Sequence, residues 1–343
     1  MHDFLNQGCA MRVMMIGGTG YLGYFVCRDL VARGHRVLAV GLGTPAPGTM
    51  PEGVDCADCN TDTCPEYRLA ALLADVDVVI HAAGADGRFS DKAPVIDAYR
   101  ARNVAPMRRL VSAMKSAGAQ RLVIFGSYYT SLARQSPGLV DLARNPYPLS
   151  RQEQMDLAFA LCGNAIGCDV LELPYIFGAA PGRGTLWGYV MDKVSAPGQV
   201  AVPAGGTACV TADQVAAAAV GAVERQGGHT AWPIGGANLS YAAIYRMFAA
   251  AMGLAPDFVP ADPSADRAAA EAQRRRLVEA GIETGYDPLD VAAWQEQDLF
   301  LDPAPAMTAL GYGADDIARA IRETVSATQV HGGQGPASLR KPA

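Results

Sequence analysis

The chain has 343 residues, of which half are hydrophobic and 18% are charged, and its formal net charge is −6. This length can bury a large core, in one domain with a lobe or in two domains. The negative charge excludes the basic surface of a nucleic-acid-binding protein, and no apolar run approaches the roughly 20 residues that span a bilayer.

The N-terminal segment lacks a basic region followed by an apolar stretch, so we expect no signal peptide and a cytoplasmic protein. The eight cysteines are then expected to be reduced thiols. Cys56, Cys59 and Cys64 lie close together in the sequence, but no fourth ligand such as a histidine lies beside them. We therefore expect no metal site.

Short runs of branched apolar residues alternate with helical stretches in the first half of the chain. The runs predict buried strands at 12–16, 36–40, 77–81, 121–125 and 169–173. The stretches between them predict helices at about 21–33, 66–74, 93–117 and 148–163. This alternation is typical of βαβ units and of a parallel sheet covered on both faces.

The first predicted strand leads into I-G-G-T-G-Y-L-G at residues 16–23. A glycine-rich turn lets the backbone approach a pyrophosphate, whose charge is stabilised by the N–H groups and the dipole of the following helix. Glycines spaced three apart between a strand and a helix therefore predict a dinucleotide site. Its expected residues are Gly17, Thr19, Gly20, Tyr21, Leu22 and Gly23.

Further segments resemble, in the same order, the motifs of the extended short-chain dehydrogenase/reductases, which form the NAD-dependent epimerase/dehydratase family. These segments are D-V-V-I-H-A-A-G (77–84), Asn103-Val104, R-L-V-I-F-G-S (121–127), L-P-Y-I-F-G (173–178) and L-G-Y (310–312). The resemblance runs from about residue 11 to 325. It implies an α/β fold with a Rossmann-type doubly wound parallel sheet and a smaller C-terminal substrate lobe.

Beyond Pro174 the chain is richer in glycine and proline, and helices are predicted near 211–226, 240–252, 264–280 and 314–326. We assign 11–173 to the Rossmann domain, completed by part of 211–235. The substrate lobe is assigned to 174–210 and 236–326. The composition of 327–343 predicts a flexible end, as does the position of 1–10.

The resemblance also implies which residues contact the cofactor. Asp58 matches the acidic residue that receives the adenine amino group, with Cys59 beside it. Further implied contacts are Ala82, Ala83, Gly84, Asn103, Tyr147, Arg151, Pro174 and Ile176. The second strand ends at Gly41-Leu42-Gly43-Thr44. That end has neither the acid expected for NAD nor the arginine expected for NADP, so the choice between them stays open.

The catalytic pair of this family is Tyr-x-x-x-Lys, but the matching stretch here is N-P-Y-P-L-S-R, with Tyr147 and Arg151. Pro148 suits the first turn of a helix, which places the pair one turn apart on one face. A cation stabilises a phenolate, and Arg151 can also bind the nicotinamide ribose, although its planar fork differs from an ammonium. Tyr189 and Lys193 form a literal Tyr-x-x-x-Lys, but their place in the motif order predicts the substrate lobe.

The resemblance places a substrate-binding hydroxyl at the end of the 121–127 segment, on either Ser127 or Tyr128. Relatives that act on nucleotide sugars hold the diphosphate with arginines, which are absent from 205–213 and 295–303. Motif order brings Arg183 to the substrate, with Trp187 nearby. One arginine suits a carboxylate or a carbonyl better than a diphosphate, so we expect a small or weakly anionic substrate.

The sequence thus predicts an NAD(P)-dependent oxidoreductase that interconverts an alcohol and a ketone, with Tyr147 as acid/base. Two alternatives stay open: an epimerase or dehydratase that oxidises its substrate transiently with bound cofactor, and a non-catalytic dinucleotide-binding protein. The family often dimerises through the helices that match 93–117 and 148–163. We therefore expect a homodimer that binds a small molecule, with no nucleic-acid or membrane partner.

Overall fold

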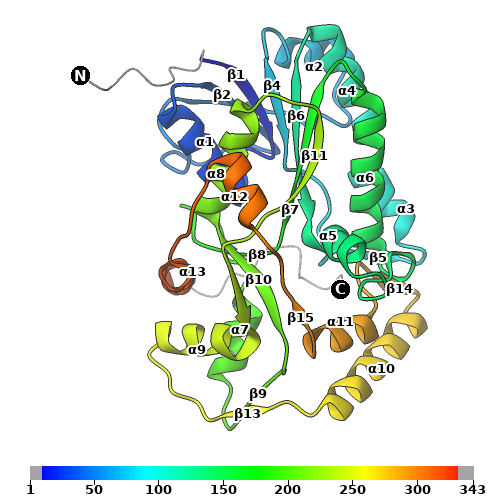
Figure 1. Ribbon diagram of the computed structural model, residues 1–343, viewed down its shortest axis with the longest axis vertical. Coiled ribbons are helices and arrows are strands. Elements are labelled where there is room, and N and C mark those ends of the chain that lie inside the picture. The colour runs from blue at the N-terminus through cyan, green and yellow to red at the C-terminus, as the bar shows by residue number, and fades with distance from the viewer. Residues whose placement is uncertain (1–9, 331–343) are drawn as a thin grey trace.

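The computed structural model describes residues 10–330, and a seven-stranded parallel sheet forms the upper half of the molecule in Figure 1. The strand order is β11-β7-β6-β4-β1-β2-β3. The strands are β1 (Arg12–Ile16), β2 (Arg36–Gly41), β3 (Val54–Asp58), β4 (Val78–His81), β6 (Arg121–Ser127), β7 (Gly167–Leu173) and β11 (His229–Pro233). The order reverses between β1 and β4, which is where doubly wound sheets bind ligands outside the carboxyl ends of the strands.

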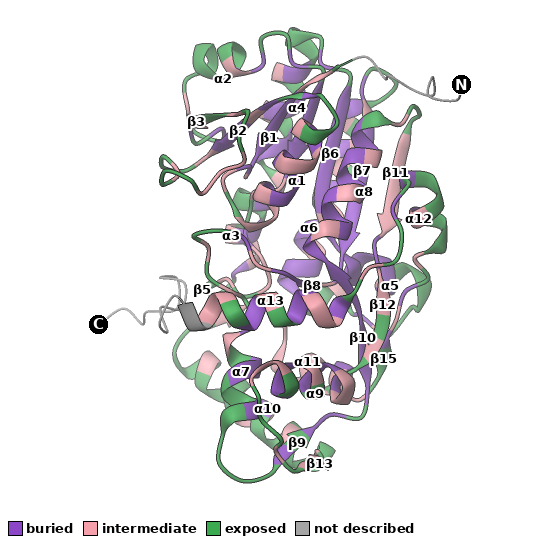
Figure 2. Cartoon of the chain, turned by 90° about the vertical axis from the view of Figure 1, so that its left-hand side faces the viewer, coloured by how far each residue is buried: buried purple, intermediate pink, exposed green. Residues whose placement is uncertain are grey.

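Helices cover both faces of this sheet. One face carries α1 (Tyr21–Ala32) and α8 (Ala212–Glu224), with α12 (Ala304–Leu310) against α8. The other face carries α2 (Glu66–Leu72), α4 (Pro106–Ala117) and α6 (Pro146–Cys162). Alternate side chains of a strand point to opposite faces, so strands buried on both sides are apolar nearly throughout. Figure 2 shows the central strands of the sheet as buried.

The α/β fold predicted from the sequence is confirmed, and each of the five predicted strands forms. The pattern missed β3 and β11 at the two edges of the sheet, and α5 (Tyr128–Gln135). The predicted helix 93–117 is divided into α3 (Ile96–Tyr99), the π-helical turn η1 (Arg100–Val104) and α4.

A smaller lobe lies below the sheet in Figure 1. Its central strand β10 (Gly206–Thr211) pairs with β8 (Tyr175–Phe177), β12 (Ala237–Ser240) and β15 (Asp298–Leu299). Around this sheet lie α7 (Gly188–Ser195), β9 (Val200–Val202), α9 (Tyr241–Ala251), β13 (Phe258–Pro260), α10 (Pro263–Glu279), α11 (Pro288–Gln295) and α13 (Ile317–Val330).

The lobe and the sheet domain are joined next to the carboxyl edge of the sheet. Strand β14 (Ile282–Thr284) pairs antiparallel with β5 (Ser90–Lys92), which follows β4 in the chain. A short 3-10 helix, η2 (Leu142–Arg144), precedes α6. Because α8 packs on α1 and β11 pairs with β7, the segment from α8 to β11 lies with the large sheet.

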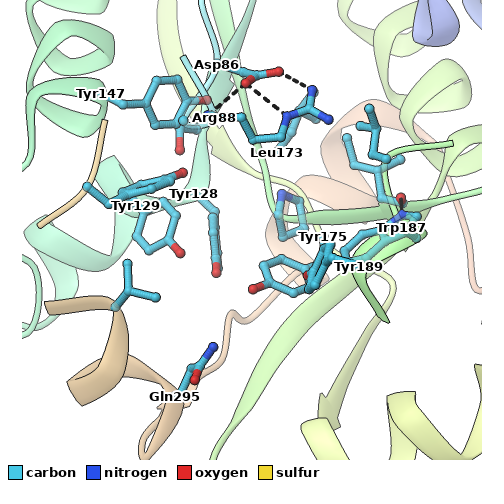
Figure 3. Close-up of a pocket in the computed structure, with 17 residues that line it drawn as sticks. Asp86, Arg88, Tyr128, Tyr129, Tyr147, Leu173, Tyr175, Trp187, Tyr189 and Gln295 are labelled. Carbon is cyan, nitrogen blue, oxygen red and sulfur yellow. Dashed lines mark hydrogen bonds and ion pairs between the residues drawn. The ribbon is translucent and has the colours of Figure 1, made fainter. Parts of the chain in front are cut away.

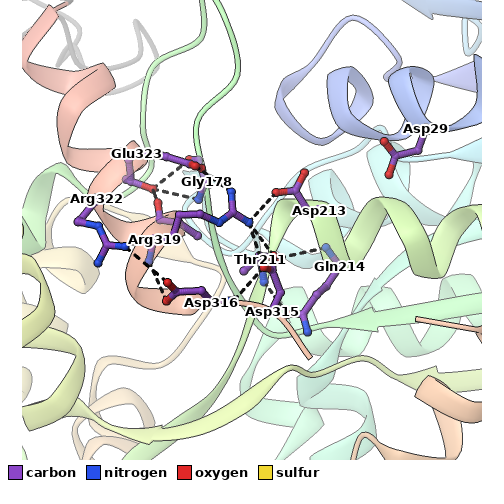
Figure 4. Close-up of polar contacts among 12 residues, drawn as sticks. Asp29, Gly178, Thr211, Asp213, Gln214, Asp315, Asp316, Arg319, Arg322 and Glu323 are labelled. Atoms are coloured by element: carbon purple, nitrogen blue, oxygen red, sulfur yellow. Dashed lines mark hydrogen bonds and ion pairs between the residues drawn. The ribbon is translucent and has the colours of Figure 1, made fainter. Parts of the chain in front are cut away.

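A charged network fixes the C-terminal helix α13 against the sheet domain (Figure 4). Arg319 binds Asp213 at the start of α8 and Asp315, with N–O distances of 3.2 and 2.9 Å. Asp213 also accepts from Arg28 of α1 at 2.8 Å, and the Thr211 hydroxyl donates to Asp315 at 2.7 Å. These contacts join helices from both ends of the chain.

Of the predicted flexible ends, residues 1–9 and 331–343 lie outside the described residues, and 327–330 belong to α13. Between residues 10 and 330, no helix combines the length and the apolar character that crossing a bilayer requires.

Candidate active site

The glycine-rich loop lies at the carboxyl end of β1 and leads into α1, which begins with Tyr21 and Leu22. Gly17 has φ of +84°, and a Cβ there would lie 3.0 Å from the carbonyl carbon of Ala82. A Cβ at Gly23 would lie 2.3 Å from the backbone oxygen of Gly18. A side chain at Gly17 or Gly23 would therefore collide with the backbone, so both positions require glycine.

No side chain caps the N-terminus of α1 at Gly20. The first N–H groups of a helix have no partner within the helix, and together with its dipole they form an anion site. The start of α1 thus offers free N–H groups, and the loop before it has no room for a side chain at Gly17. Both features fit the pyrophosphate of a dinucleotide.

The expected adenine contacts lie at the ends of β2 and β3. Asp58 is exposed, and its Oδ1 accepts from the Gly43 amide at 2.9 Å. Cys59 is buried, and its amide donates to the Gly41 carbonyl at 2.9 Å. A Cβ at Gly41 would lie 1.9 Å from Thr19 Oγ1, so Thr19 fills the space beside the end of β2.

The backbone that follows β4 is held by Asn103, which lies in the π-helical turn. Asn103 accepts from the Ala85 amide at 2.8 Å and donates to the Ala85 carbonyl at 3.1 Å and to Ser150 Oγ at 3.0 Å. Gly84 has φ of +126°, and a Cβ there would lie 2.5 Å from Asn103 Oδ1. π-Helical turns occur frequently at functional sites, and this one fixes the segment of Ala83 and Gly84 beside α6.

Helix α6 places Tyr147 and Arg151 on one face, and the two residues are 9% and 8% exposed. The guanidinium carbon of Arg151 lies 5.4 Å from the ring centre of Tyr147. Arg151 donates to Gln154 Oε1 at 2.8 Å and to the Ala85 carbonyl at 3.3 Å. Its Nε is buried and has no hydrogen-bond partner among the described residues, so a donor remains for a bound group such as a ribose hydroxyl.

His81, at the end of β4, is a titratable group close to Arg151 and is 2% exposed. Burial, and then the positive charge of Arg151, lower the pKa of His81 to about 4. The imidazole is therefore neutral at neutral pH, and the positive charges near Tyr147 are those of Arg151 and Arg88.

A cavity of about 420 Å³ opens beside Tyr147 between the sheet edge and the lobe (Figure 3). Aromatic rings from distant parts of the chain form much of its wall, namely Tyr128, Tyr129, Tyr175, Trp187, Tyr189 and Tyr286. Pro174 and Ile176, expected at the cofactor, also line it. Its charged lining residues are Asp86 and Arg88, which form an ion pair with half-exposed side chains.

Both residues expected to hold the substrate oxygen line the cavity. Ser127 ends β6 and is the N-cap residue of α5. The Tyr128 hydroxyl is 3.1 Å from Thr207 Oγ1 on β10, and burial raises its pKa well above the ordinary value. The Tyr128 hydroxyl is thus engaged by the lobe and remains protonated.

The structure does not bring Arg183 to the cavity. Motif order predicts this residue at the substrate, but the segment after β8 turns back to the glycine-rich loop, where Arg183 donates to the Thr19 carbonyl at 2.8 Å. Trp187 lines the cavity as expected, and its Nε1 donates to the Ile176 carbonyl at 2.8 Å.

The literal Tyr-x-x-x-Lys is divided between two environments on α7. Tyr189 lines the cavity. The exposed Lys193 instead has its ammonium nitrogen 5.1 Å from the ring centre of Tyr245. The described residues also include no group of three or more His, Cys, Asp or Glu side chains placed to hold a metal ion.

Sequence reasoning missed several cavity residues. Asp86 and Arg88 directly follow the D-V-V-I-H-A-A-G segment, so their place after a sheet strand was a usable signal. Tyr286 and Gln295 come from a segment without a motif, and the pairing of β14 with β5 brings that segment to the site.

A family profile matches the part of the chain that carries this geometry. The profile of the NAD dependent epimerase/dehydratase family matches residues 13–229, which include the glycine-rich loop, Tyr147 and Arg151. The chain belongs to this family. The predicted class, an enzyme of the extended short-chain dehydrogenase/reductase type with a dinucleotide cofactor, is confirmed by the match.

Two curated relatives of this family member share parts of its sequence. It is 30% identical over 148 residues to 2-alkyl-3-oxoalkanoate reductase of Stenotrophomonas maltophilia (strain K279a), which is 40% of this chain and 36% of that protein. It is 30% identical over 125 residues to UDP-glucose 4-epimerase of Klebsiella pneumoniae, which is 34% of this chain and 89% of that protein. The alignment with the reductase therefore spans little more than a third of its length.

Solved structures share the fold over nearly the whole chain. The crystal structure of gox2253 has a TM-score of 0.73 at 22% identity, covering 93% of this chain and 98% of that chain. UDP-glucose-4-epimerase from Stenotrophomonas maltophila, with bound NAD and formylated UDP-arabinopyranose, has a TM-score of 0.67 at 20% identity, covering 94% and 98%. These likenesses show the fold.

Proposed function

We propose that this member of the epimerase/dehydratase family is an NAD(P)-dependent oxidoreductase that interconverts an alcohol and a ketone on a small or weakly anionic substrate. The observation that carries the proposal is the placement of Tyr147. Its phenol lines an aromatic cavity of about 420 Å³, and the Arg151 guanidinium lies 5.4 Å from its ring centre.

In this proposal Tyr147 gives its hydroxyl proton to the substrate oxygen during reduction and takes it back during oxidation. Arg151 stabilises the phenolate that forms, because a nearby cation favours the charged form of an acid. Ser127 holds the reacting oxygen, since the Tyr128 hydroxyl is engaged by Thr207. The dinucleotide, when bound, supplies or accepts the hydride.

The chain's own residues would hold the dinucleotide along the carboxyl edge of the sheet. The open glycine-rich loop and the uncapped start of α1 suit its pyrophosphate. The unpartnered Nε of Arg151 suits a ribose hydroxyl. We propose Asp58 and Cys59 for the adenine end.

The lining of the cavity suits a substrate with an apolar body and one polar end. Arg88 uses Nε and Nη2 toward Asp86, which leaves Nη1 to donate to a carboxylate or carbonyl oxygen. The name of the reductase relative describes a compound with an alkyl chain, a ketone and a carboxylate. Such a 3-oxo acid is the substrate class that we propose to test first.

The epimerase relative and neighbours keep a second candidate function in view, which is redox-neutral chemistry on a nucleotide sugar. The charged lining of the cavity does not favour it, because Arg88 is the only cation among the described lining residues and a diphosphate needs several cations.

The test is to supply purified protein with reduced cofactor and either 3-oxo acids or UDP-sugars. Net consumption of reduced nicotinamide with an oxo acid supports the proposal. An epimer formed without net consumption supports the second candidate. Cofactor binding without either reaction supports a non-catalytic dinucleotide-binding protein.

We further propose the division into a Rossmann domain of 11–173 with part of 211–235 and a lobe of 174–210 and 236–326. A homodimer through the helical segments 93–117 and 148–163, which contain α3, η1, α4 and most of α6, is also proposed, and light scattering on the purified protein tests it. The seven described cysteines are free thiols, which supports the proposed cytoplasmic location.

A further inference from the structure

Arg183 is an arginine outside the substrate cavity that binds the glycine-rich loop. Its Nε and Nη2 donate to the Thr19 carbonyl at 3.1 and 2.8 Å. Its Nη1 donates to the carbonyls of Thr49 at 2.5 Å and Pro181 at 2.7 Å. The guanidinium carbon lies 5.6 Å from the ring centre of Tyr24. One side chain from the segment after β8 thus joins the first βα loop to the β2–β3 connection.

The positive charge of Arg183 is not neutralised by a carboxylate among residues 10–330. Its hydrogen-bond acceptors are neutral carbonyls and the Met50 sulfur at 3.1 Å. Burial lowers its pKa, and the groups whose charges act on it are Tyr24, Cys27 and Cys56. An arginine remains charged in proteins, so a half-buried cation stands next to the phosphate-binding loop without a counter-charge.

Thr19 connects this cation to the end of β2. A Cβ at Gly41 would lie 1.9 Å from Thr19 Oγ1, so the Thr19 side chain covers the last residue of the strand. In Rossmann sheets this strand end faces the adenosine ribose, where an acid binds the 2′-hydroxyl of NAD and an arginine accommodates the 2′-phosphate of NADP. Residues 41–44 contain no acid, and the carboxylate that reaches this strand end is that of Asp58, whose Oδ1 is held by the Gly43 amide at 2.9 Å.

We propose that Arg183 is the receptor for the adenosine 2′-phosphate, so that the chain prefers NADP(H) to NAD(H). The inference rests on the dinucleotide site of the proposed function and is independent of the substrate. A thioether is a weak hydrogen-bond acceptor. The N–H group that contacts the Met50 sulfur can therefore most easily exchange this acceptor for a phosphate oxygen. The receptor comes from the segment after β8, which belongs to the lobe. The Rossmann pattern places such a residue directly after the second strand instead.

The test measures affinity for dinucleotides by calorimetry on the full chain, and it does not depend on turnover. NADPH should bind at least about 10-fold more tightly than NADH, and raised salt should reduce the difference. Arg183→Met should lower the affinity for NADPH by about 10- to 100-fold, as for a lost hydrogen bond to a charged group. It should change the affinity for NADH by less than about 3-fold. Arg183→Lys should retain part of the preference, because it keeps the charge.

A second variant tests the site without removing the contacts of Arg183. Leu42 is 75% exposed directly after β2, so Leu42→Asp introduces a carboxylate there with little effect on packing. Leu42→Asp should lower the affinity for NADPH and leave the affinity for NADH nearly unchanged. The neutral control Leu42→Asn should leave both affinities nearly unchanged.

Three results would overturn the inference. Equal losses of NADH and NADPH affinity in Arg183→Met would make the residue a pyrophosphate contact or a loop clamp. Equal affinities of the unchanged protein for the two cofactors, or no binding of either, would also exclude a 2′-phosphate receptor.

A preference for NADPH that depends on Arg183, found in a protein without activity on any substrate, would support the inference and contradict the proposed reaction.

Discussion

Arg151 lies one helical turn after Tyr147, with its guanidinium carbon 5.4 Å from the centre of the phenol ring. The hydrogen bonds of Arg151 go to the neutral oxygens of Gln154 and Ala85. Its charge is therefore free to stabilise a phenolate, which is the role that a lysine ammonium has in the family pattern. The arrangement makes the unusual Tyr-x-x-x-Arg a working acid/base pair in our proposal.

Tyr147→Phe removes the hydroxyl and keeps the ring that packs on Tyr286 at 5.6 Å. Turnover should fall by roughly 10²–10⁴, the usual contribution of a general acid or base, while dinucleotide affinity stays within a few-fold. Steady-state kinetics and calorimetry measure the two effects. Lys193→Met is the control. If that change were the damaging one and Tyr147→Phe harmless, the pair on α7 would be catalytic instead.

Substitutions of Arg151 separate charge from shape. Arg151→Lys keeps a cation and should retain partial activity, although the bond to Gln154 Oε1 is rebuilt or lost. Arg151→Met should lower kcat by about 100-fold or more and also weaken the dinucleotide, because the charge acts on phenol and ribose alike. Full activity of the methionine variant would show that the guanidinium has no part in the chemistry.

The parts of the fold that the sequence predicted are those set by local patterns. The buried strand β1 and the glycine-rich loop depend on residues within a dozen positions of each other, and both formed at the predicted residues. Strand β3 has mostly exposed or half-exposed side chains, so it leaves no apolar run to detect. The π-helical turn that carries Asn103 has no sequence signal beyond that of a helix.

The candidate site also combines residues that the sequence predicted with residues that it did not. The spacing of Tyr147 and Arg151 is a property of one helix and could be read from the sequence. The position of Arg183 depends on how the segment after β8 turns back over another loop, and spacing along the chain carries no information about that. The contact of Tyr286 with Tyr147 likewise requires the pairing of β14 with β5.

Gly20 offers a test of the dinucleotide site that preserves the fold. Its backbone is extended at the N-cap of α1, and a Cβ there would meet a single neighbour, the Gly17 oxygen at 3.1 Å. Asp is a favourable N-cap residue, which offsets the small shift that a Cβ requires of the Gly17 carbonyl, so Gly20→Asp should fold with a Tm close to that of the unchanged protein. Its carboxylate would occupy the N–H groups meant for the pyrophosphate, and affinity should fall by about 100-fold. The neutral isostere Gly20→Asn should lose less. Undiminished affinity in folded Gly20→Asp would contradict this placement of the cofactor.

Arg88 offers a test of the substrate class. Arg88→Met should raise KM for a 3-oxo acid by about 10- to 100-fold, as for a lost charged hydrogen bond, and leave KM for a ketone without a carboxylate nearly unchanged. Asp86→Asn keeps the shape of the partner and frees Arg88 for the acid, so it should lower that KM. Kinetics on the acid and its methyl ester compare the two cases. The same KM change for acid and ester would argue against carboxylate recognition.

The neutral, buried His81 makes stability depend on pH. Its pKa in the folded chain is lowered from 6.5 to about 4 by burial and by Arg151. Between these values the unfolded chain binds a proton that the folded chain does not, so the free energy of unfolding falls as pH falls from 6.5 toward 4. At about 1.4 kcal/mol per unit of pKa, the contribution of this residue is roughly 3 kcal/mol. Below the folded value both states are protonated and the dependence on His81 ends.

His81→Asn removes the titrating ring, so urea unfolding should show a flatter pH dependence than in the unchanged protein, whatever the absolute stability of the variant. The comparison is between slopes, because other groups titrate in both proteins and cancel. Parallel slopes from pH 7 to pH 4.5 would mean that His81 already binds its proton in the folded chain. It would then add a positive charge to those of Arg151 and Arg88, and the stabilisation of the Tyr147 phenolate could not be assigned to the two arginines alone.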